Sequence, residues 1–293
     1  MVIKKKHSLK HSLKHSLKKN NKLSKLIGGK PYEYQGDLKD GLAHGYGKMT
    51  YKNGDIYEGL FKDNKRHGKG KFIWTDGDIY EGEWQNDIKN GIGRFKYMNG
   101  DIYQGDFKDD EMDGYGTLIY FNKDIYEGEF KNSYRHGKGK FIWNDGDFYE
   151  GQWRDDQKNG YGIYLWSNGD IYNGEWHNDK MDGLGFKVLK DGHFYRGYYK
   201  DNMRHGIGQF VESNGVSYTG NWQDDKKNGL GKYRLIDGRT HDGIWENNRL
   251  IGDGPELILP FWLSNLDIFQ VRSYKVNKPR ATMYNYYNRL NKN

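Results

Sequence analysis

Apolar and polar residues alternate with a period of two in short segments along most of the chain. In one segment Tyr57, Gly59 and Phe61 share a face, and Glu58 lies on the other. Residues 68–74 alternate in the same way, with glycines and rings on one face and lysines on the other. This alternation is typical of half-buried β-strands. Because glycine has no side chain, a ring can lie flat over a neighbouring strand at each glycine.

The pattern recurs at a fixed spacing, without insertion or deletion. A tripeptide Tyr-x-Gly begins at Tyr34, Tyr57, Tyr80, Tyr103, Tyr126, Tyr149, Tyr172, Tyr195 and Tyr218, so the period is 23. His241 falls on the next step, and Gly-x-Gly recurs in the same period from Gly45 to Gly254. Self-similarity at a fixed period is the mark of a repeat protein in which each unit contacts only its neighbours.

A longer period of three repeats is superimposed on the 23-residue period. The residue before Gly-x-Gly follows the order His, Asn, Asp at His67, Asn90, Asp113, His136, Asn159, Asp182, His205 and Asn228. This cycle gives no indication of function by itself.

Turn signals separate the predicted strands. Asn-Gly or Asp-Gly dipeptides, which favour tight hairpin turns, occur at Asn53, Asp76, Asn99, Asp145 and Asn168. We therefore expect tight turns on this edge and longer loops, such as residues 62–67, on the opposite edge. The expected fold is all-β: an elongated single-layer antiparallel array of ten β-hairpin repeats over residues 31–254.

Composition agrees with a repeat array and excludes several classes of protein. Only 34% of the residues are hydrophobic, 30% are charged and 16% are aromatic, so we do not expect a core between two packed layers. There is no cysteine, which excludes disulfides and thiolate metal sites. The sequence also lacks a signal peptide and any apolar run of roughly 18 residues, so we expect a cytosolic protein.

The net charge of +7 hides an acidic body between two basic ends. Residues 1–30 hold ten lysines and no acid, and residues 272–293 hold six basic residues and no acid. Removing these sixteen charges from the total leaves −9 for residues 31–271. The aromatic face could in principle stack nucleic-acid bases, but an acidic body does not favour nucleic acid as a partner.

The repeats resemble a known family. Tyr80-Glu-Gly-Glu-Trp84, then Asn90-Gly-Ile-Gly93 and Asn99-Gly-Asp101, resemble the MORN (membrane occupation and recognition nexus) repeat, and the resemblance covers about residues 32–254. It implies a β-hairpin array that acts as a scaffold or adaptor, in many members at membranes or cytoskeletal assemblies. Some relatives dimerise through their arrays, and phospholipid binding has been proposed for others.

A few positions depart from the pattern of the family. Lys123 replaces a turn glycine, Lys187 and Glu212 replace apolar residues of the aromatic face, and His241 and Pro255 mark the tenth repeat. We expect weaker packing in the seventh and eighth repeats and a capping role for the tenth. Some relatives carry a phosphoinositide kinase or lysine methyltransferase domain, but the stretch that follows the array here, from Pro255 to Asn293, is too short for one.

We expect no catalytic, cofactor or metal site. A phosphate-binding Gly-x-Gly needs a following helix, whereas here each pair opens a strand. His44 and His67 lie one repeat apart, about 10 Å, and metal ligands must all lie about 2 Å from one ion.

The acidic residues beside the Asn-Gly turns allow two interpretations. They could form a docking stripe for a basic partner or for the chain's own tails, or they could hydrogen-bond locally as Asp does in turns. They are Asp55, Asp78, Asp101, Asp124, Asp147 and Asp170.

The N-terminal arm, residues 1–30, repeats HSLK three times. As a helix it would place its leucines on one face and its lysines on the other, and such a helix can lie on an anionic membrane. A solvated low-complexity arm and, less in keeping with the lack of arginine, a transit peptide are the alternatives. The candidate membrane-binding residues are Lys4, Lys5, Lys6, Lys10, Lys14, Lys18, Lys19, Lys22, Leu9, Leu13 and Leu17.

Residues 255–271 are dense in apolar groups and precede a basic tail at residues 272–293. The last hairpin exposes an edge strand and an aromatic face, so we expect this segment to cover them as a cap. A homodimer contact is the alternative. The residues proposed for the cap or dimer contact are Leu257, Leu259, Phe261, Trp262 and Leu263.

These observations favour a non-enzymatic scaffold that binds partner proteins. We expect it near the inner face of a membrane or a membrane-linked cytoskeleton, held by its basic arm and contacting anionic phospholipid. A soluble oligomeric structural protein that binds no lipid and an accessory subunit of a lipid kinase or other enzyme are the alternatives.

Overall fold

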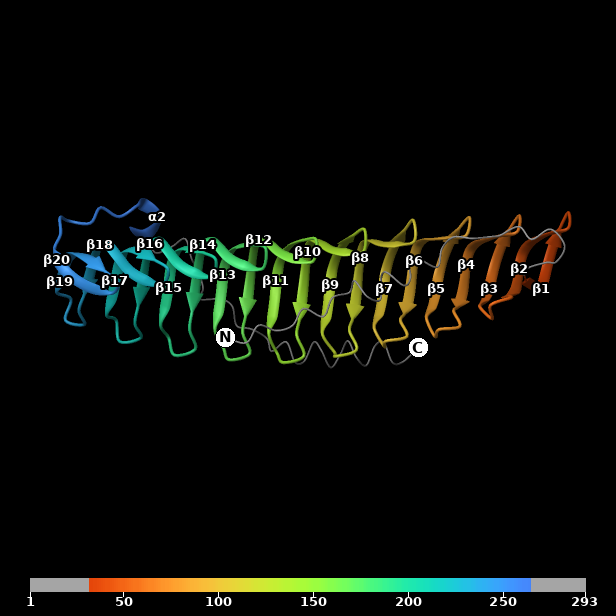
Figure 1. The fold of residues 1–293 in the computed structure, drawn as a ribbon, viewed down its shortest axis with the longest axis horizontal. Coiled ribbons are helices and arrows are strands. Elements are labelled where there is room, and N and C mark those ends of the chain that lie inside the picture. Colours follow the sequence, from red (N-terminus) through yellow and green to blue (C-terminus); the bar gives the residue numbers. More distant parts are fainter. Residues whose placement is uncertain (1–31, 265–293) are drawn as a thin grey trace. The chain divides into compact units, whose positions relative to one another are not determined.

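The computed structural model describes residues 32–264. Twenty strands belong to one antiparallel sheet, and the described residues contain one four-residue helix, α2 (Phe261–Ser264). Apart from the first and the last, each strand pairs with the strand before and after it in the sequence, so the predicted hairpin repeats are confirmed (Figure 1). The predictions for residues 1–30 and for the basic tail concern residues outside the described range.

Two compact units divide the chain at Gly137 and Lys138, within β10. The strands that lie in the first unit are β1 (Tyr32–Lys39), β2 (Leu42–Tyr51), β3 (Ile56–Lys62), β4 (Lys65–Ile73), β5 (Ile79–Gln85), β6 (Ile88–Lys96), β7 (Ile102–Lys108), β8 (Glu111–Ile119) and β9 (Ile125–Lys131). β10 (Tyr134–Ile142) is followed in the second unit by β11 (Phe148–Arg154), β12 (Gln157–Leu165), β13 (Ile171–His177), β14 (Lys180–Val188), β15 (Phe194–Lys200), β16 (Met203–Val211), β17 (Ser217–Gln223), β18 (Lys226–Arg234), β19 (Thr240–Glu246) and β20 (Arg249–Asp253).

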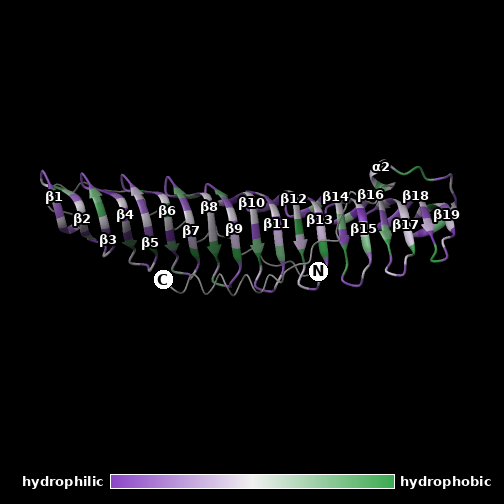
Figure 2. Ribbon diagram, turned by 180° about the vertical axis from the view of Figure 1, so that it is seen from behind, coloured by the Kyte–Doolittle hydropathy of each residue, from purple (hydrophilic) through white to green (hydrophobic). Residues whose placement is uncertain are grey.

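The sheet has an aromatic face and a second face. Figure 2 shows hydrophobic and hydrophilic residues alternating along the strands. On the aromatic face, Tyr57, Phe61 and Phe72 are buried, whereas Glu58 and Lys71 on the second face are exposed. The core therefore consists of rings that pack on one side of a single sheet, as the alternation predicts.

Tyrosine rings of the Tyr-x-Gly motif lie over pairs of glycines. Gly59 and Gly70 face each other across β3 and β4, and a Cβ atom at Gly70 would overlap the Tyr57 ring. The Tyr57 hydroxyl donates a hydrogen bond of 2.9 Å to the Leu60 carbonyl. Glycine is required here because only a bare backbone lets the ring approach so closely.

The first glycine of the Gly-x-Gly motif has a positive φ in nine of the ten repeats, and a bulge accounts for it. Between the Gly59–Gly70 and Phe61–Arg66 pairs, Leu60 alone faces three residues of β4. One of these three, Gly68, has a φ of 69°. The bulge therefore needs a residue that adopts positive φ readily, which glycine does at no steric cost.

The prediction of which edge carries the tight turns was wrong. Lys62 pairs with Lys65, so Asp63 and Asn64 form a two-residue turn with φ of 51° and 66°, the type I′ geometry. At the Asn-Gly edge the loops are longer, because the Tyr51 amide bonds the Asp55 carbonyl at 2.9 Å. Asp and Asn tolerate the left-handed region better than most residues, so these turns do not need glycine.

Candidate partner-binding surfaces

The aromatic face is closed by contacts between successive repeats. The Tyr57 ring meets Phe61 of its own repeat and Trp84 of the next edge to face, with ring centres 4.9 and 5.5 Å apart. Trp84 Nε1 also donates to the Gly70 carbonyl at 3.2 Å. These rings form the core, so they are not free to stack on bases or other flat ligands.

Cations lie among the rings at one position of the repeat. The Arg66 guanidinium lies 4.2 Å from the Trp84 ring centre and 4.9 Å from that of Phe72. Lys89 Nζ lies 5.1 Å from the Phe95 ring centre. The position follows the three-repeat cycle, with the order Arg, Lys, Met at Arg66, Lys89, Met112, Arg135, Lys158, Met181, Arg204 and Lys227.

At seven of these eight positions, a side chain of the following turn accepts a hydrogen bond from the backbone amide, a contact that we call the clasp. Asp87 Oδ1 accepts bonds from the Arg66 amide at 2.9 Å and from its Nε at 3.1 Å. Arg66 Nη2 in turn donates to the Asp87 carbonyl at 2.7 Å. Where the cycle reaches Met112, the clasping residue is Ser133, whose hydroxyl accepts from the Met112 amide at 3.1 Å.

Lys89 is almost completely buried, with 3% of its surface exposed. Burial lowers the pKa of its amine to about 8, and Asp110, 3.9 Å away, opposes part of that shift. Because the surrounding rings and Asp110 enclose it, this amine holds two repeats together and has no path to a substrate.

The acidic residues beside the Asn-Gly turns bond the next repeat. Asp55 Oδ1 accepts from the Thr75 amide at 2.9 Å, and Asp78 Oδ1 accepts from the Met98 amide at 2.8 Å. Asp101 does the same for Phe121, and Asp78 and Asp101 are each 8% exposed. The structure therefore supports the hydrogen-bonding interpretation of these carboxylates, extended to the neighbouring repeat.

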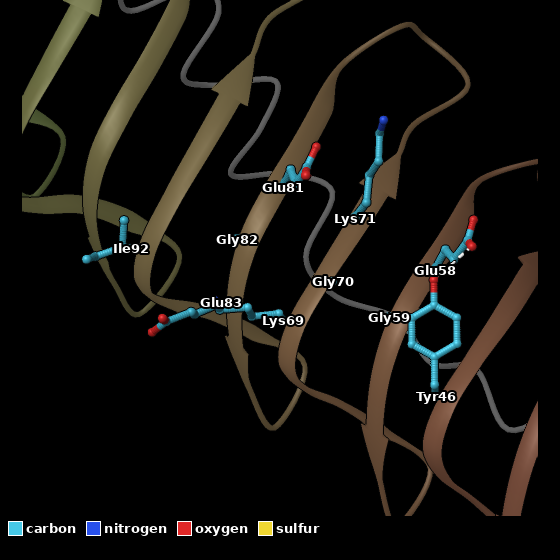
Figure 3. A pocket seen from close by; sticks show the side chains of 10 residues that line it. All are labelled: Tyr46, Glu58, Gly59, Lys69, Gly70, Lys71, Glu81, Gly82, Glu83 and Ile92. Carbon is cyan, nitrogen blue, oxygen red and sulfur yellow. Dashed lines mark hydrogen bonds between the residues drawn. The ribbon is translucent and has the colours of Figure 1, made fainter. Parts of the chain in front are cut away.

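The second face of the first unit contains a hollow of about 660 Å³ (Figure 3). Its floor is glycine backbone, and Tyr46 and Ile92 stand at its borders, exposed by 55% and 64%. The Tyr46 hydroxyl donates to Glu58 at 2.9 Å. The lining residues are Tyr46, Glu58, Gly59, Lys69, Gly70, Lys71, Glu81, Gly82, Glu83 and Ile92.

In the second unit, Trp262 and Leu263 pack on the second face beside β15. The Leu263 side chain is 1% exposed, and the Trp262 ring meets Tyr198 edge to face with ring centres 5.6 Å apart. Arg196 Nη2 donates to the Leu263 carbonyl at 2.9 Å, and burial lowers the pKa of Arg196.

The described part of the predicted cap, residues 255–264, does not cover the last strand; the rest of the predicted cap, residues 265–271, lies outside the described range. All residues of β20 are exposed, as is Ile258 at 91%. Leu257 and Leu259 are half-buried, and the side chain of Phe261 lies outside the described set. The sequence analysis did not predict the clasp or the role of Arg196. The three-repeat cycle at the residue next to Arg66 could have indicated the clasp.

The membrane-binding candidates, from Lys4 to Lys22, lie outside the described residues. Within residues 32–264 no helix has the length and apolarity needed to cross a bilayer. The same residues contain no group of three or more His, Asp or Glu side chains arranged to hold a metal ion.

Nine consecutive segments match the MORN repeat, at residues 34–56, 57–79, 80–102, 103–125, 126–148, 149–171, 172–194, 195–216 and 218–238. The chain belongs to the MORN repeat family. The resemblance seen in the sequence is thereby confirmed for nine of the ten units. The MORN array has a tenth hairpin, β19 and β20, beyond the matched segments.

Solved structures similar to this MORN array include the TCP10 domain of Danio rerio CPAP, at 13% identity and a TM-score of 0.40, covering 71% of this chain and 99% of that one. Another is the same domain with a peptide of Danio rerio STIL, at 14% identity and a TM-score of 0.37, covering 73% and 100%. A third is the Drosophila melanogaster SAS-4 TCP domain with a proline-rich motif of Ana2, at 18% identity and a TM-score of 0.34, covering 59% and 88%. No curated protein sequence matches the chain.

Proposed function

We propose that this MORN array is a non-enzymatic scaffold that binds partner proteins on its second face. The contrast between the two faces carries the proposal. The aromatic face uses its rings and cations in contacts between repeats, whereas in the first unit Tyr46, Ile92 and Tyr115 stand exposed on the second face by 55%, 64% and 55%. Each is the central residue of a Gly-x-Gly, and the central residues of two consecutive repeats lie about 10 Å apart.

The scaffold acts near a membrane through its arm. Ten lysines and no acid in residues 1–30 provide the charge for an anionic lipid surface, with each lysine near that surface contributing on the order of 1 kcal/mol. The acidic body does not favour such a surface, so the arm is the element proposed to hold the array there.

Site-specific photo-crosslinking tests partner binding in cells. A photoreactive side chain replaces Ile92 on the second face or, as a matched control, Met98 at the turn edge, which is 70% exposed. We expect discrete adducts from position 92 and few from position 98. Equal adducts from both positions, or none from either, would contradict a partner-binding second face.

Sedimentation with vesicles tests the membrane part separately. Full-length protein should bind phosphatidylserine-containing vesicles at low salt and release at high salt, because exposed charges are screened. Replacing the eight candidate lysines by glutamine should remove binding. Binding that persists in this variant would move lipid contact to the array, and no binding by either protein would favour a soluble scaffold.

A further inference from the structure

The second face carries the same three residue types in the same order at two places. In the first unit Arg94, Gln104 and Thr117 are cross-strand neighbours on β6, β7 and β8. In the second unit the corresponding neighbours, on β15, β16 and β17, are Arg196, Gln209 and Thr219. We call these sets the first and second triplets. Both occupy the same row, one residue from the paired glycines.

The second triplet is bonded and covered. Arg196 Nε donates to Gln209 Oε1, and Gln209 Nε2 donates to Thr219 Oγ1, both at 2.9 Å. Arg196 Nη2 then holds the Leu263 carbonyl at the end of α2. Arg196 and Thr219 are 6% and 5% exposed. The triplet is thus a receptor for a short apolar turn that presents a main-chain carbonyl, and Tyr198 supplies the apolar wall for Trp262.

The first triplet is uncovered within the described part of the chain. Gln104 is exposed, and Arg94 Nε is a buried donor with no hydrogen-bond partner there. The Arg94 side chain is half-exposed, so an acceptor that reaches its guanidinium would use donors left unpaired among the described residues. Ile92, two residues from Arg94 on the same strand, takes the place that Tyr198 has relative to Arg196, and it borders the hollow.

We propose that the first triplet and the adjoining hollow bind a partner-protein segment with the chemistry of residues 260–263. That segment is a proline followed by an apolar turn, with its last carbonyl accepting from Arg94 and an aromatic ring against Ile92. The three carboxylates and two lysines that line the hollow nearly cancel, which favours an uncharged ligand over a basic or acidic one. The chain's own segment already occupies the second triplet, so the ligand comes from another protein. This inference rests on the proposed scaffold function and names its ligand class.

The capped peptide Leu257–Ser264, labelled with a fluorophore, serves as the probe against full-length protein. We expect saturable binding measured by anisotropy. Arg94→Gln should weaken it at least tenfold, because glutamine cannot supply the guanidinium donors. Arg154→Gln, at an exposed arginine on β11, is the matched control and should leave binding unchanged. Thermal unfolding of each variant verifies that the fold is intact.

Three results would overturn the proposal. They are no saturable binding, equal binding by the Arg94→Gln protein, and loss of binding only in Arg196→Gln, which would mean that the peptide exchanges with the chain's own segment. Light scattering without peptide tests whether a second copy of the chain occupies the site. A dimer that dissociates on the Arg94→Gln change would assign the site to that second copy. Crosslinked adducts at position 92 without saturable binding of the peptide would support the scaffold function and contradict only this ligand class.

Discussion

The guanidinium of Arg66 joins two repeats, because it packs on the Trp84 ring and bonds both the side chain and the carbonyl of Asp87. The contact combines a cation–π interaction with a charge-assisted hydrogen bond in a half-buried setting. Since the turn that carries Asp87 belongs to the next repeat, each such contact fixes the register between neighbours.

Asp87→Ala should lower the free energy of unfolding by about 2–4 kcal/mol, because it leaves the half-buried Arg66 charge without its carboxylate partner. The double variant Arg66→Met, Asp87→Ser copies the natural Met112–Ser133 arrangement and should recover part of that loss. Urea denaturation of Arg66→Met, Asp87→Ser and the double variant measures the coupling. Additive losses would show that the two residues act independently.

Lys89 makes stability depend on pH. Its pKa is about 8 in the folded chain and near 10.5 when unfolded, so between these values the unfolded state binds more protons and stability rises with pH. Relative to Lys89→Met, the wild-type protein should gain about 3 kcal/mol from pH 8 to 10.5. Parallel unfolding curves for the two proteins across this range would refute the burial of a charged amine.

Stability should fall again above about pH 10 in both proteins. Burial raises the pKa of Tyr57, Tyr80 and Tyr103 in the folded chain. These phenols then ionise first in the unfolded state, so the folded state loses stability as pH rises through their ordinary pKa. The near-ultraviolet absorbance of phenolate should therefore appear together with unfolding.

Gly70→Ala should destabilise the chain by roughly 1–3 kcal/mol or more, because its methyl group would overlap the Tyr57 ring. Gly252 offers a matched control, since an added Cβ there meets nothing within 4 Å. Thermal denaturation of both alanine variants compares the sites. A similar small effect at both would show that the ring can move aside.

Lys123→Gly should stabilise the chain by about 1 kcal/mol. Lys123 holds a φ of 74°, where a lysine Cβ crowds the backbone and glycine does not. The converse change, Gly100→Lys at a φ of 91°, should destabilise it, and more so because Phe121 lies over Gly100. Urea midpoints for the two variants should move in opposite directions.

Strand positions, the repeat period and the packing of tyrosine on glycine were predictable, because each depends on residues close in sequence or one repeat apart. The turns at Asp63 and Asn64 were not, since left-handed backbone is easier to foresee at glycine than at Asp or Asn. The bulge at Gly68 was not predicted, because a strictly alternating pattern pairs the residues of two strands one to one and includes no extra residue.

The second face was harder to predict than the aromatic face. Arg94 and Gln104 become neighbours only through the register of β6 and β7, two strands that belong to successive repeats. The contact of Leu263 with Arg196 joins residues 67 positions apart, and no repeat pattern encodes it. The hollow forms where glycines of neighbouring strands lie side by side, and the composition does not indicate that arrangement.

The clasp limits how such an array can grow. Arg66 and Lys89 face aspartates, whereas Met112 faces a serine, and the order then begins again at Arg135. Duplication of the single repeat that carries Asp110 and Met112 would leave an aspartate beside a methionine, and duplication of the one that carries Ser133 and Arg135 would place a cation opposite a serine. Insertion of a block of three would preserve every pairing. An ancestral gene could therefore lengthen by three repeats at a time more readily than by one.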